Sequence, residues 1–215
     1  MTTSTKNSLI GRITDCIGFN AKYHQYEPIE LESEATIVSP VEAKVAHIGR
    51  INKGRIISKR DREVNLKDLV GDYARQFSEG SYINFYLSPF NKHFWVTPCR
   101  GSFVYTQKNE GKSWLPVFTG LENLFGVEVF DRAVKRNASI GSIFQTDKFS
   151  IAMIAVGSLN VNRVCMDYEE KRQYDQGVPC GYFSIGSSML LCFPSLQDFL
   201  IKEGDLVKIG QGIVK

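Results

Sequence analysis

Short runs of alternating apolar and polar residues, separated by turn-forming residues, recur along most of this chain. The first clear case is residues 35–50, which read as two strands that meet at Ser39-Pro40. Apolar side chains occupy alternate positions from Val41 to Val45, and His47 then breaks the pattern. A period of two is typical of a strand that buries one face.

The same criteria predict further elements along the chain. Expected strands are a hairpin in residues 51–59 around Lys53-Gly54, and residues 82–87, 102–106, 142–145, 148–159 and 189–193. Residues 65–71 are expected to form a short helix, with Asn65 at its start and Gly71 at its end, extended by residues 72–80; residues 9–19 also suit a short helix.

Other segments are expected to lack regular strands or to turn. They are a loop presenting His93 between residues 88 and 98, a turn at residues 107–111, a strand and turn at residues 131–137, and an exposed polar loop at residues 165–177. Frequent turns between short strands predict a mainly β (α+β) fold of antiparallel sheets with a few short helices.

Composition narrows the class of protein. The 215 residues, 43% of them hydrophobic, suit one globular domain or at most two small ones. A net charge of +3 is too mild to indicate a nucleic-acid partner. Five widely spaced cysteines without a C-x-x-C pair favour neither a disulfide framework nor a zinc site. Residues 1–7 lack the apolar core of a signal peptide, and the run 151–156 is too short to span a bilayer, so we expect a cytoplasmic protein.

The candidate chemistry lies near the end of the chain, in residues 181–193. A small, polar Gly186-Ser187-Ser188 stretch precedes an apolar strand. The Ser187 hydroxyl can attack the Gly186 carbonyl because glycine has no side chain to block the approach. The resulting ester can eliminate, split the chain and leave a pyruvoyl group at position 187, which is an electron sink. Taken alone, the tripeptide is more typical of an ordinary β-turn.

Four stretches together resemble the phosphatidylserine decarboxylase family, in the order in which that family has them. They are Val38-Ser39-Pro40-Val41-Glu42-Ala43; Tyr86-Leu87-Ser88-Pro89-Phe90-Asn91-Lys92-His93 with Pro98-Cys99-Arg100-Gly101; Val156-Gly157-Ser158-Leu159-Asn160-Val161; and Gly181-Tyr182-Phe183-Ser184-Ile185-Gly186-Ser187-Ser188. The resemblance runs from about residue 35 to residue 215 and leaves residues 1–34 as an N-terminal extension. Residues 202–210 also look like half of a biotinyl/lipoyl-type barrel, so a barrel-sandwich core is expected.

The resemblance implies a self-processing, pyruvoyl-dependent decarboxylase. The chain would be cut between Gly186 and Ser187, and the pyruvoyl group made from Ser187 would form a Schiff base with the substrate amine before CO2 is lost. His93 matches the family histidine tied to decarboxylation, and Glu42 the polarising carboxylate. The substrate would be a serine-headgroup phospholipid or a related amino acid. A lipid substrate would require peripheral contact with a membrane, and a homo-oligomer is expected.

Departures from the family pattern matter at three positions. Glu42 stands for the family's Asp, Ala43 for its Gly, and Val96 for a second His that assists cleavage. Valine cannot move a proton, so the alternative hypothesis is a non-processing relative that acts as a binding module.

Simpler roles are also open at individual positions. His93 could be an ordinary loop histidine and Glu42 a surface carboxylate. Phe85, Tyr86, Phe94 and Trp95 could form a lipid-facing wall or simply pack in the core. Cys99, beside the histidine loop, is expected to be a buried, inert thiol.

Overall fold

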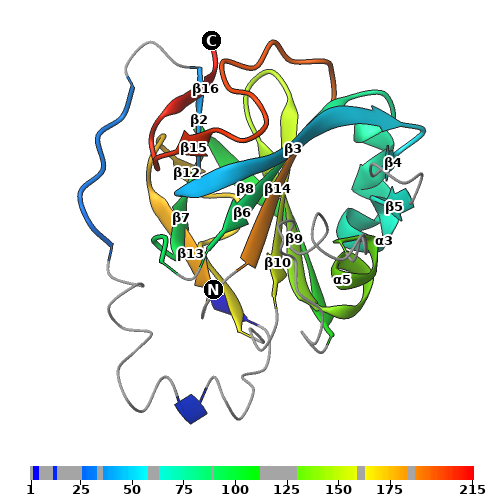
Figure 1. Cartoon of the computed structure of the whole chain (residues 1–215), viewed down its shortest axis with the longest axis horizontal. Helices are drawn as coiled ribbons and strands as arrows, with labels where there is room; N and C mark the ends of the chain where they lie inside the picture. The colour runs from blue at the N-terminus through cyan, green and yellow to red at the C-terminus, as the bar shows by residue number, and fades with distance from the viewer. Residues whose placement is uncertain are drawn as a thin grey trace.

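The computed structural model of the chain describes residues 2–4, 12–13, 26–32, 36–57, 63–88, 90–111, 130–158, 163–183 and 187–215. Strands dominate these stretches, and every pairing between them is antiparallel (Figure 1). The described helices are α3 (Lys67–Val70), the 3₁₀ helix η1 (Gly71–Phe77) and α5 (Phe130–Arg136). The predicted class, mainly β with antiparallel sheets and a few short helices, is confirmed.

Among the described residues, ten strands form one large sheet. Its order is β12 (Gln173–Tyr174), β8 (Gly101–Glu110), β9 (Ala138–Gln145), β10 (Ser150–Gly157), β14 (Ser187–Phe193), β6 (Ser81–Leu87), β3 (Ala43–Asn52), β4 (Arg55–Ile57) and β5 (Glu63–Asn65), with β15 (Leu206–Val207) also paired to β3. The strand that begins with Ser187 is therefore an interior strand, bonded on both edges.

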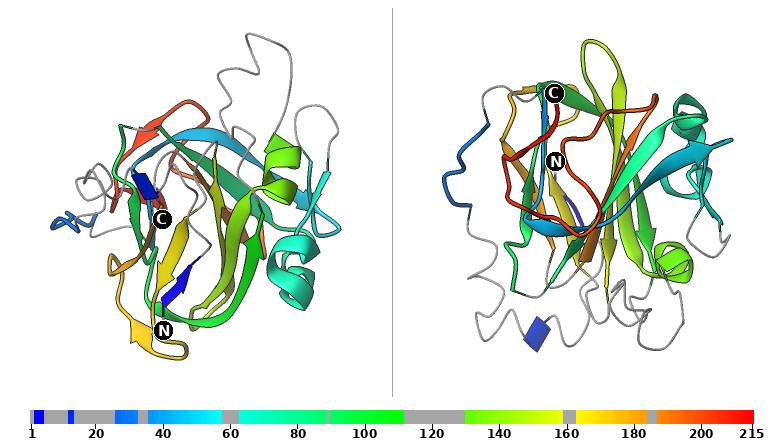
Figure 2. Two further views of the ribbon diagram at one scale, coloured as in Figure 1. Left: turned by 90° about the horizontal axis from the view of Figure 1, so that it is seen from below. Right: turned by 45° about the horizontal axis from the view of Figure 1, so that its top comes forward.

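Two smaller sheets accompany the large one. A four-stranded sheet has the order β1 (Thr2–Ser4), β11 (Val164–Asp167), β13 (Pro179–Phe183) and β7 (Phe94–Val96). Strand β16 (Gly212–Val214) pairs with β2 (Ile37–Val38). The four-stranded sheet lies over one face of the large sheet, and the helices lie on the other (Figure 2).

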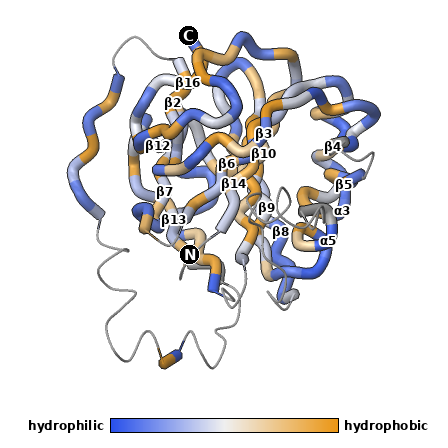
Figure 3. Tube along the Cα trace, viewed as in Figure 1, coloured by the Kyte–Doolittle hydropathy of each residue, from blue (hydrophilic) through white to orange (hydrophobic). Residues whose placement is uncertain are grey.

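Strand β14 contributes apolar side chains to both layers of the core. Met189 and Leu191 belong to the cluster between the sheets, together with Phe85 of β6 and Trp95 of β7. Leu190, on the opposite face, belongs to a second cluster that includes apolar residues of α3, η1 and α5. Every residue of β14 is buried, and hydrophobic positions gather along the central strands in Figure 3. Burial on both faces explains the unbroken apolar run from Met189 to Phe193.

Two local predictions are confirmed in detail. The hairpin between β3 and β4 turns at Lys53 and Gly54, whose φ angles are 49° and 71°. Positive φ at both central residues is the twist that suits a two-residue hairpin, and glycine adopts it without strain. The alternation in β3 breaks where the sequence pattern breaks, because the register with β6 shifts between Val45 and His47.

Two predictions in the middle of the chain are wrong. The expected turn at residues 107–111 is instead the end of β8, whose last residue, Glu110, pairs with Ala138 of β9. The expected strand and turn at residues 131–137 is helix α5, in which Ala133 and Val134 are buried between exposed basic residues. In both places the partner element, rather than local composition, decides the structure.

Two segments expected to be loops contain strands. The polar segment 165–177 holds β12 and most of β11, where Cys165 and Met166 are buried against β13. The segment between Ser88 and Pro98 contains β7, which pairs with β13. In both segments the apolar runs are only two or three residues long and lie between polar residues, so the strand pattern is too short to recognise.

Near the end of the chain, β15 pairs with β3 and β16 pairs with β2. None of the sheets formed by the described strands closes into a barrel. The described helices include none long and apolar enough to cross a membrane. The helix expected at residues 9–19 lies almost wholly outside the described residues.

Candidate active site

Ser187 is the first residue of β14 and has a strand partner on each side. It lies opposite Leu87, the last residue of β6, and opposite Gly157, the last residue of β10. The interpretation of this serine as part of a turn is therefore wrong, because two strand neighbours already hold it in the sheet. Gly186, the other half of the expected cleavage site, lies outside the described residues.

The Ser187 side chain is fully buried, and its Oγ has no hydrogen-bond partner among the described residues. Strand alternation places this hydroxyl on the face of Met189, toward the layer between the sheets, whereas Ser188 shares the opposite face with Leu190. A buried hydroxyl without a partner typically costs about 1–3 kcal/mol of stability. Such an unsatisfied group calls for a functional reason, and a nucleophile that must stay available to react is one.

His93 lies in the loop between β6 and β7 and is fully buried. Its backbone carbonyl accepts a 2.8 Å hydrogen bond from the N–H of Phe183. Phe183 is the last residue of β13, immediately before residues 184–186. The histidine loop is thus joined to the chain directly ahead of the expected cut.

Glu42 is half-buried beside the same loop. Its Oε1 accepts a 3.0 Å hydrogen bond from Nδ2 of Asn91, and nearby the N–H of Val96 donates to the carbonyl of Pro40 at 3.0 Å. These two links attach the Ser39-Pro40 corner to the loop on both sides of His93. Glu42 is therefore hydrogen-bonded to the histidine loop rather than being a free surface carboxylate.

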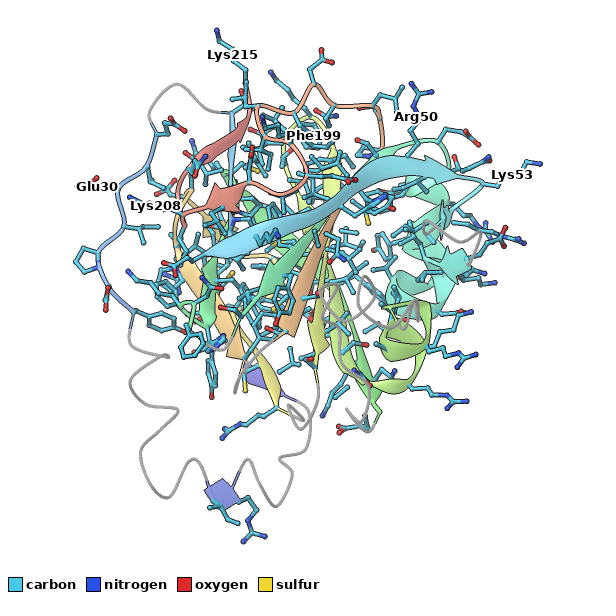
Figure 4. All side chains as sticks on the ribbon, viewed as in Figure 1. Glu30, Arg50, Lys53, Phe199, Lys208 and Lys215 are labelled. Carbon is cyan, nitrogen blue, oxygen red and sulfur yellow. The ribbon has the colours of Figure 1, made fainter. Side chains whose placement is uncertain are left out.

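A cavity of about 390 Å³ opens beside Glu42. Its walls are formed by Lys92 and by two segments far apart in sequence, residues 28–32 and residues 208–211. Figure 4 shows Glu30 on the first segment and Lys208 on the second. Because the cavity is open, solvent and small solutes can reach the Glu42 carboxylate.

Val96, which stands for the second family histidine, is fully buried in an apolar cluster with Phe94 and Ile209. Trp95, its neighbour in β7, points to the opposite face and packs against Phe183 in a tilted arrangement, with ring centroids 4.3 Å apart. The side chain at position 96 therefore lies on the face of the small sheet away from the layer that contains Ser187.

The remaining aromatic and thiol predictions can be judged from burial. Phe85, Phe94 and Trp95 are fully buried and Tyr86 is partly buried, so these rings pack in the core rather than forming a lipid-facing wall. Burial raises the pKa of the Cys99 thiol to about 12, so it stays protonated and inert near neutral pH.

One buried residue of the site was missed by sequence reasoning. Asn137, between α5 and β9, donates a 2.7 Å hydrogen bond from Nδ2 to the carbonyl of Gly157, the strand partner of Ser187. Its only signal in the sequence is a polar amide placed immediately before an otherwise small and apolar strand. The role of Asn137 becomes clear only when the fold shows that the last residue of β10, Gly157, lies beside it.

All four sequence stretches singled out above meet in the fold. Leu87 and Gly157, from the second and third stretches, flank Ser187 in the fourth. Asn91 joins the second stretch to Glu42 in the first. Among the described residues, the Ser187 hydroxyl is not hydrogen-bonded to either His93 or Glu42.

A family model described as phosphatidylserine decarboxylase matches residues 19–215. The chain belongs to the phosphatidylserine decarboxylase family. Similar curated relatives bear the name phosphatidylserine decarboxylase proenzyme. They include proteins of Halalkalibacterium halodurans, 29% identical over 168 residues (77% of this chain, 62% of the relative), of Brevibacillus brevis, 28% over 202 residues (83% and 70%), and of Anoxybacillus flavithermus, 28% over 192 residues (86% and 69%). The chain matches 62–70% of the length of these relatives.

The word proenzyme in those names fits a phosphatidylserine decarboxylase that must be converted before it acts. The sequence resemblance places the expected pyruvoyl group at Ser187, whose buried Oγ has no hydrogen-bond partner among the described residues. A three-carbon keto acid group has about the size of the serine that it replaces, and strands on both sides would hold it in place. The described residues therefore fit the group.

Proposed function

We propose that this chain is a self-processing, pyruvoyl-dependent decarboxylase that converts the serine headgroup of phosphatidylserine to the amine. The observation that carries the proposal is Ser187: a fully buried hydroxyl without a partner among the described residues, next to Gly186 in the sequence and on the face of β14 toward the layer between the sheets. Ser188 is also buried and unsatisfied but lies on the opposite face. Family membership supports the reaction class. The lipid substrate and the pyruvoyl cofactor are the proposed parts.

Processing would begin at Ser187. Its oxygen forms an ester with the Gly186 carbonyl carbon as the C–N bond between the two residues breaks, and the freed nitrogen takes up the hydroxyl proton. Loss of the ester as a carboxylate, together with the Ser187 α-proton, leaves an enamine. Water hydrolyses the enamine to the ketone and ammonia is released, so atoms and electrons balance.

The pyruvoyl carbonyl supplies the electron sink for decarboxylation, as a bound cofactor does in other enzymes. The chain's own residues supply binding and proton transfer. His93, held by Phe183, is proposed to return a proton to the carbon that loses CO2. Glu42, fixed by Asn91 beside the open cavity, is proposed to orient and polarise the reacting groups.

Self-cleavage is expected to be slow because Val96 cannot transfer a proton. General acid–base assistance is worth about 10²–10⁴ in rate, and the valine at position 96 cannot provide it. Processing is needed once per molecule, so a slow reaction suffices. The buried, apolar setting of Val96 is also the observation that favours the alternative function, a binding module that is never cut.

Peripheral contact with a membrane belongs to the proposal because the substrate is a lipid. Phe90, between Ser88 and His93, is 86% exposed, the most exposed large apolar side chain among the described residues. An aromatic ring at this site, beside Lys92, is suited to the boundary between headgroups and acyl chains. Cytoplasmic location, a homo-oligomer and a domain boundary at residue 34 stay predictions.

The deciding experiment is intact-mass measurement of the purified protein, alone and after reduction with borohydride in the presence of substrate. We expect two chains, residues 1–186 and 187–215, with substrate-dependent mass added to the shorter one. Phosphatidylserine in mixed micelles, free serine and phosphoserine distinguish lipid from soluble substrates. A single uncut chain with no decarboxylase activity would overturn the proposal and leave the binding module.

A further inference from the structure

Asn91 joins the histidine loop to Glu42 through both ends of its amide. Its Oδ1 accepts hydrogen bonds from the N–H and the hydroxyl of Ser88, both at 2.8 Å. Its Nδ2 donates to Glu42 Oε1 at 3.0 Å. A backbone N–H can only donate, so the amide oxygen must face Ser88 and the amide nitrogen must face the carboxylate.

The loop around Asn91 is internally fixed. The N–H of Asn91 donates to the carbonyl of Ser88 at 3.1 Å, which closes a turn, and the N–H of Phe90 lies 3.4 Å from the Ser88 hydroxyl. The turn is complete without Glu42. The hydrogen bond from Asn91 to Glu42 is therefore not needed to close the turn, and it joins two residues 49 positions apart in the sequence.

Charged groups from several elements line the cavity beside Glu42. Lys92 lies on the same loop, and its Nζ is paired at 2.6 Å with Glu27. Glu30 and Glu32 come from the segment of residues 28–32, and Lys208 comes from the C-terminal segment of the cavity. The Glu32 carboxylate accepts the N–H of Gly212.

We propose that Asn91 is a positioning residue of this enzyme, and that its amide nitrogen holds the Glu42 carboxylate in place for the reaction. This inference rests on the proposed function, in which Glu42 takes part. An aspartate at position 91 would accept both Ser88 hydrogen bonds equally well. It would replace the donor to Glu42 with a second carboxylate, so the two roles of Asn91 are separable.

Asn91→Asp is therefore the informative variant. Two carboxylates in contact share a proton at low pH, and one of them has a raised pKa. We expect rates of cleavage and decarboxylation near wild type at about pH 5 that fall on the order of tenfold by about pH 8, because the two carboxylates repel each other once the shared proton is lost. Any alkaline loss that comes from His93 is common to both proteins, so the ratio of the variant rate to the wild-type rate should show this fall.

Two matched variants complete the experiment. Asn91→Asp combined with Glu42→Gln restores an amide-to-carboxylate hydrogen bond with the partners exchanged, so its pH profile should follow that of Glu42→Gln alone. Asn65→Asp is the control, because Asn65 Oδ1 only accepts a hydrogen bond, from the N–H of Lys67 at 3.0 Å. If Asn91→Asp matches wild type at every pH, Asn91 merely closes the turn and the inference is overturned.

Thermal unfolding in a Ser187→Ala background tests the contact apart from processing. The raised carboxyl pKa in the Asn91→Asp variant means that stability is retained below the unfolded pKa of about 4 and lost as pH rises through the folded value. If wild type is uncut and inactive while this loss is seen, the proposed function fails and the contact stands. If the loss is seen but activity is unchanged, the positioning role fails.

Discussion

The backbone N–H of Phe183 donates a 2.8 Å hydrogen bond to the carbonyl of His93, which joins the last strand before the expected cut to the loop of the expected proton donor. The two residues are 90 positions apart. This hydrogen bond is the link between the two segments that the described residues show. Cleavage and assembly of the decarboxylation site are expected to be linked.

The two adjacent serines should differ completely in processing. Ser187→Ala removes the only hydroxyl that can leave a ketone at position 187, so the chain should stay uncut. Ser188→Ala is the matched control, because both serines are buried in β14 but face opposite sides of the sheet. Intact mass after overnight incubation distinguishes them, and cleavage of the Ser187→Ala variant would contradict the assignment.

Replacing the histidine should separate processing from turnover. We expect His93→Gln to be cut but to lose about 10²–10⁴ in decarboxylation rate, the usual worth of general acid–base catalysis. The control is His47→Gln. His47 lies on β3, bonded to Tyr82 at 2.8 Å and near Glu203 at 3.4 Å, away from the loop. An equal loss of rate in both variants would show a general structural effect instead.

Asn137 should matter for both stability and cleavage. Asn137→Ala leaves the buried carbonyl of Gly157 without its donor, which should lower the free energy of unfolding by about 1–3 kcal/mol. Because Gly157 is the strand partner of Ser187, cleavage should also slow. Urea unfolding and timed gels measure the two effects. Asn52→Ala, at the exposed end of β3, is the control and should change neither.

Phe90 should govern binding to lipid surfaces. Phe90→Ser removes an exposed ring from the loop, so we expect several-fold weaker binding to phosphatidylserine vesicles without loss of thermal stability. Leu206→Ser, on β15 and 78% exposed, is the matched apolar control. Vesicle sedimentation provides the measurement. Equal weakening by both substitutions would indicate non-specific adsorption.

Features fixed by neighbouring residues could be predicted from the sequence. The Lys53-Gly54 hairpin and the irregularity at His47 both follow from local turn and alternation signals. Helix α5 and the full length of β8 could not be predicted this way, because charged or polar residues obscure positions that are buried only by packing against distant strands.

The site shows the same division. The sequence resemblance picks out Ser187, His93 and Glu42, since their motifs are local. The bond between Asn91 and Glu42, and the support of Gly157 by Asn137, join segments that approach each other only in the folded chain. Their residue types are ordinary, so no pattern along the chain marks them.

The interior place of β14 decides what happens to the fragment that begins at residue 187. That fragment keeps seven residues paired to β6 on one edge and six to β10 on the other, and its later strands remain on β3 and β2. Cleavage of one peptide bond would therefore yield two chains that stay associated. The two chains fold together as one polypeptide before the cut and do not associate as separately folded subunits. Because β14 is an interior strand, a new short chain could enter only if the longer chain unfolded. The short chains would therefore not exchange between molecules, and each molecule would keep the pyruvoyl group formed from its own Ser187.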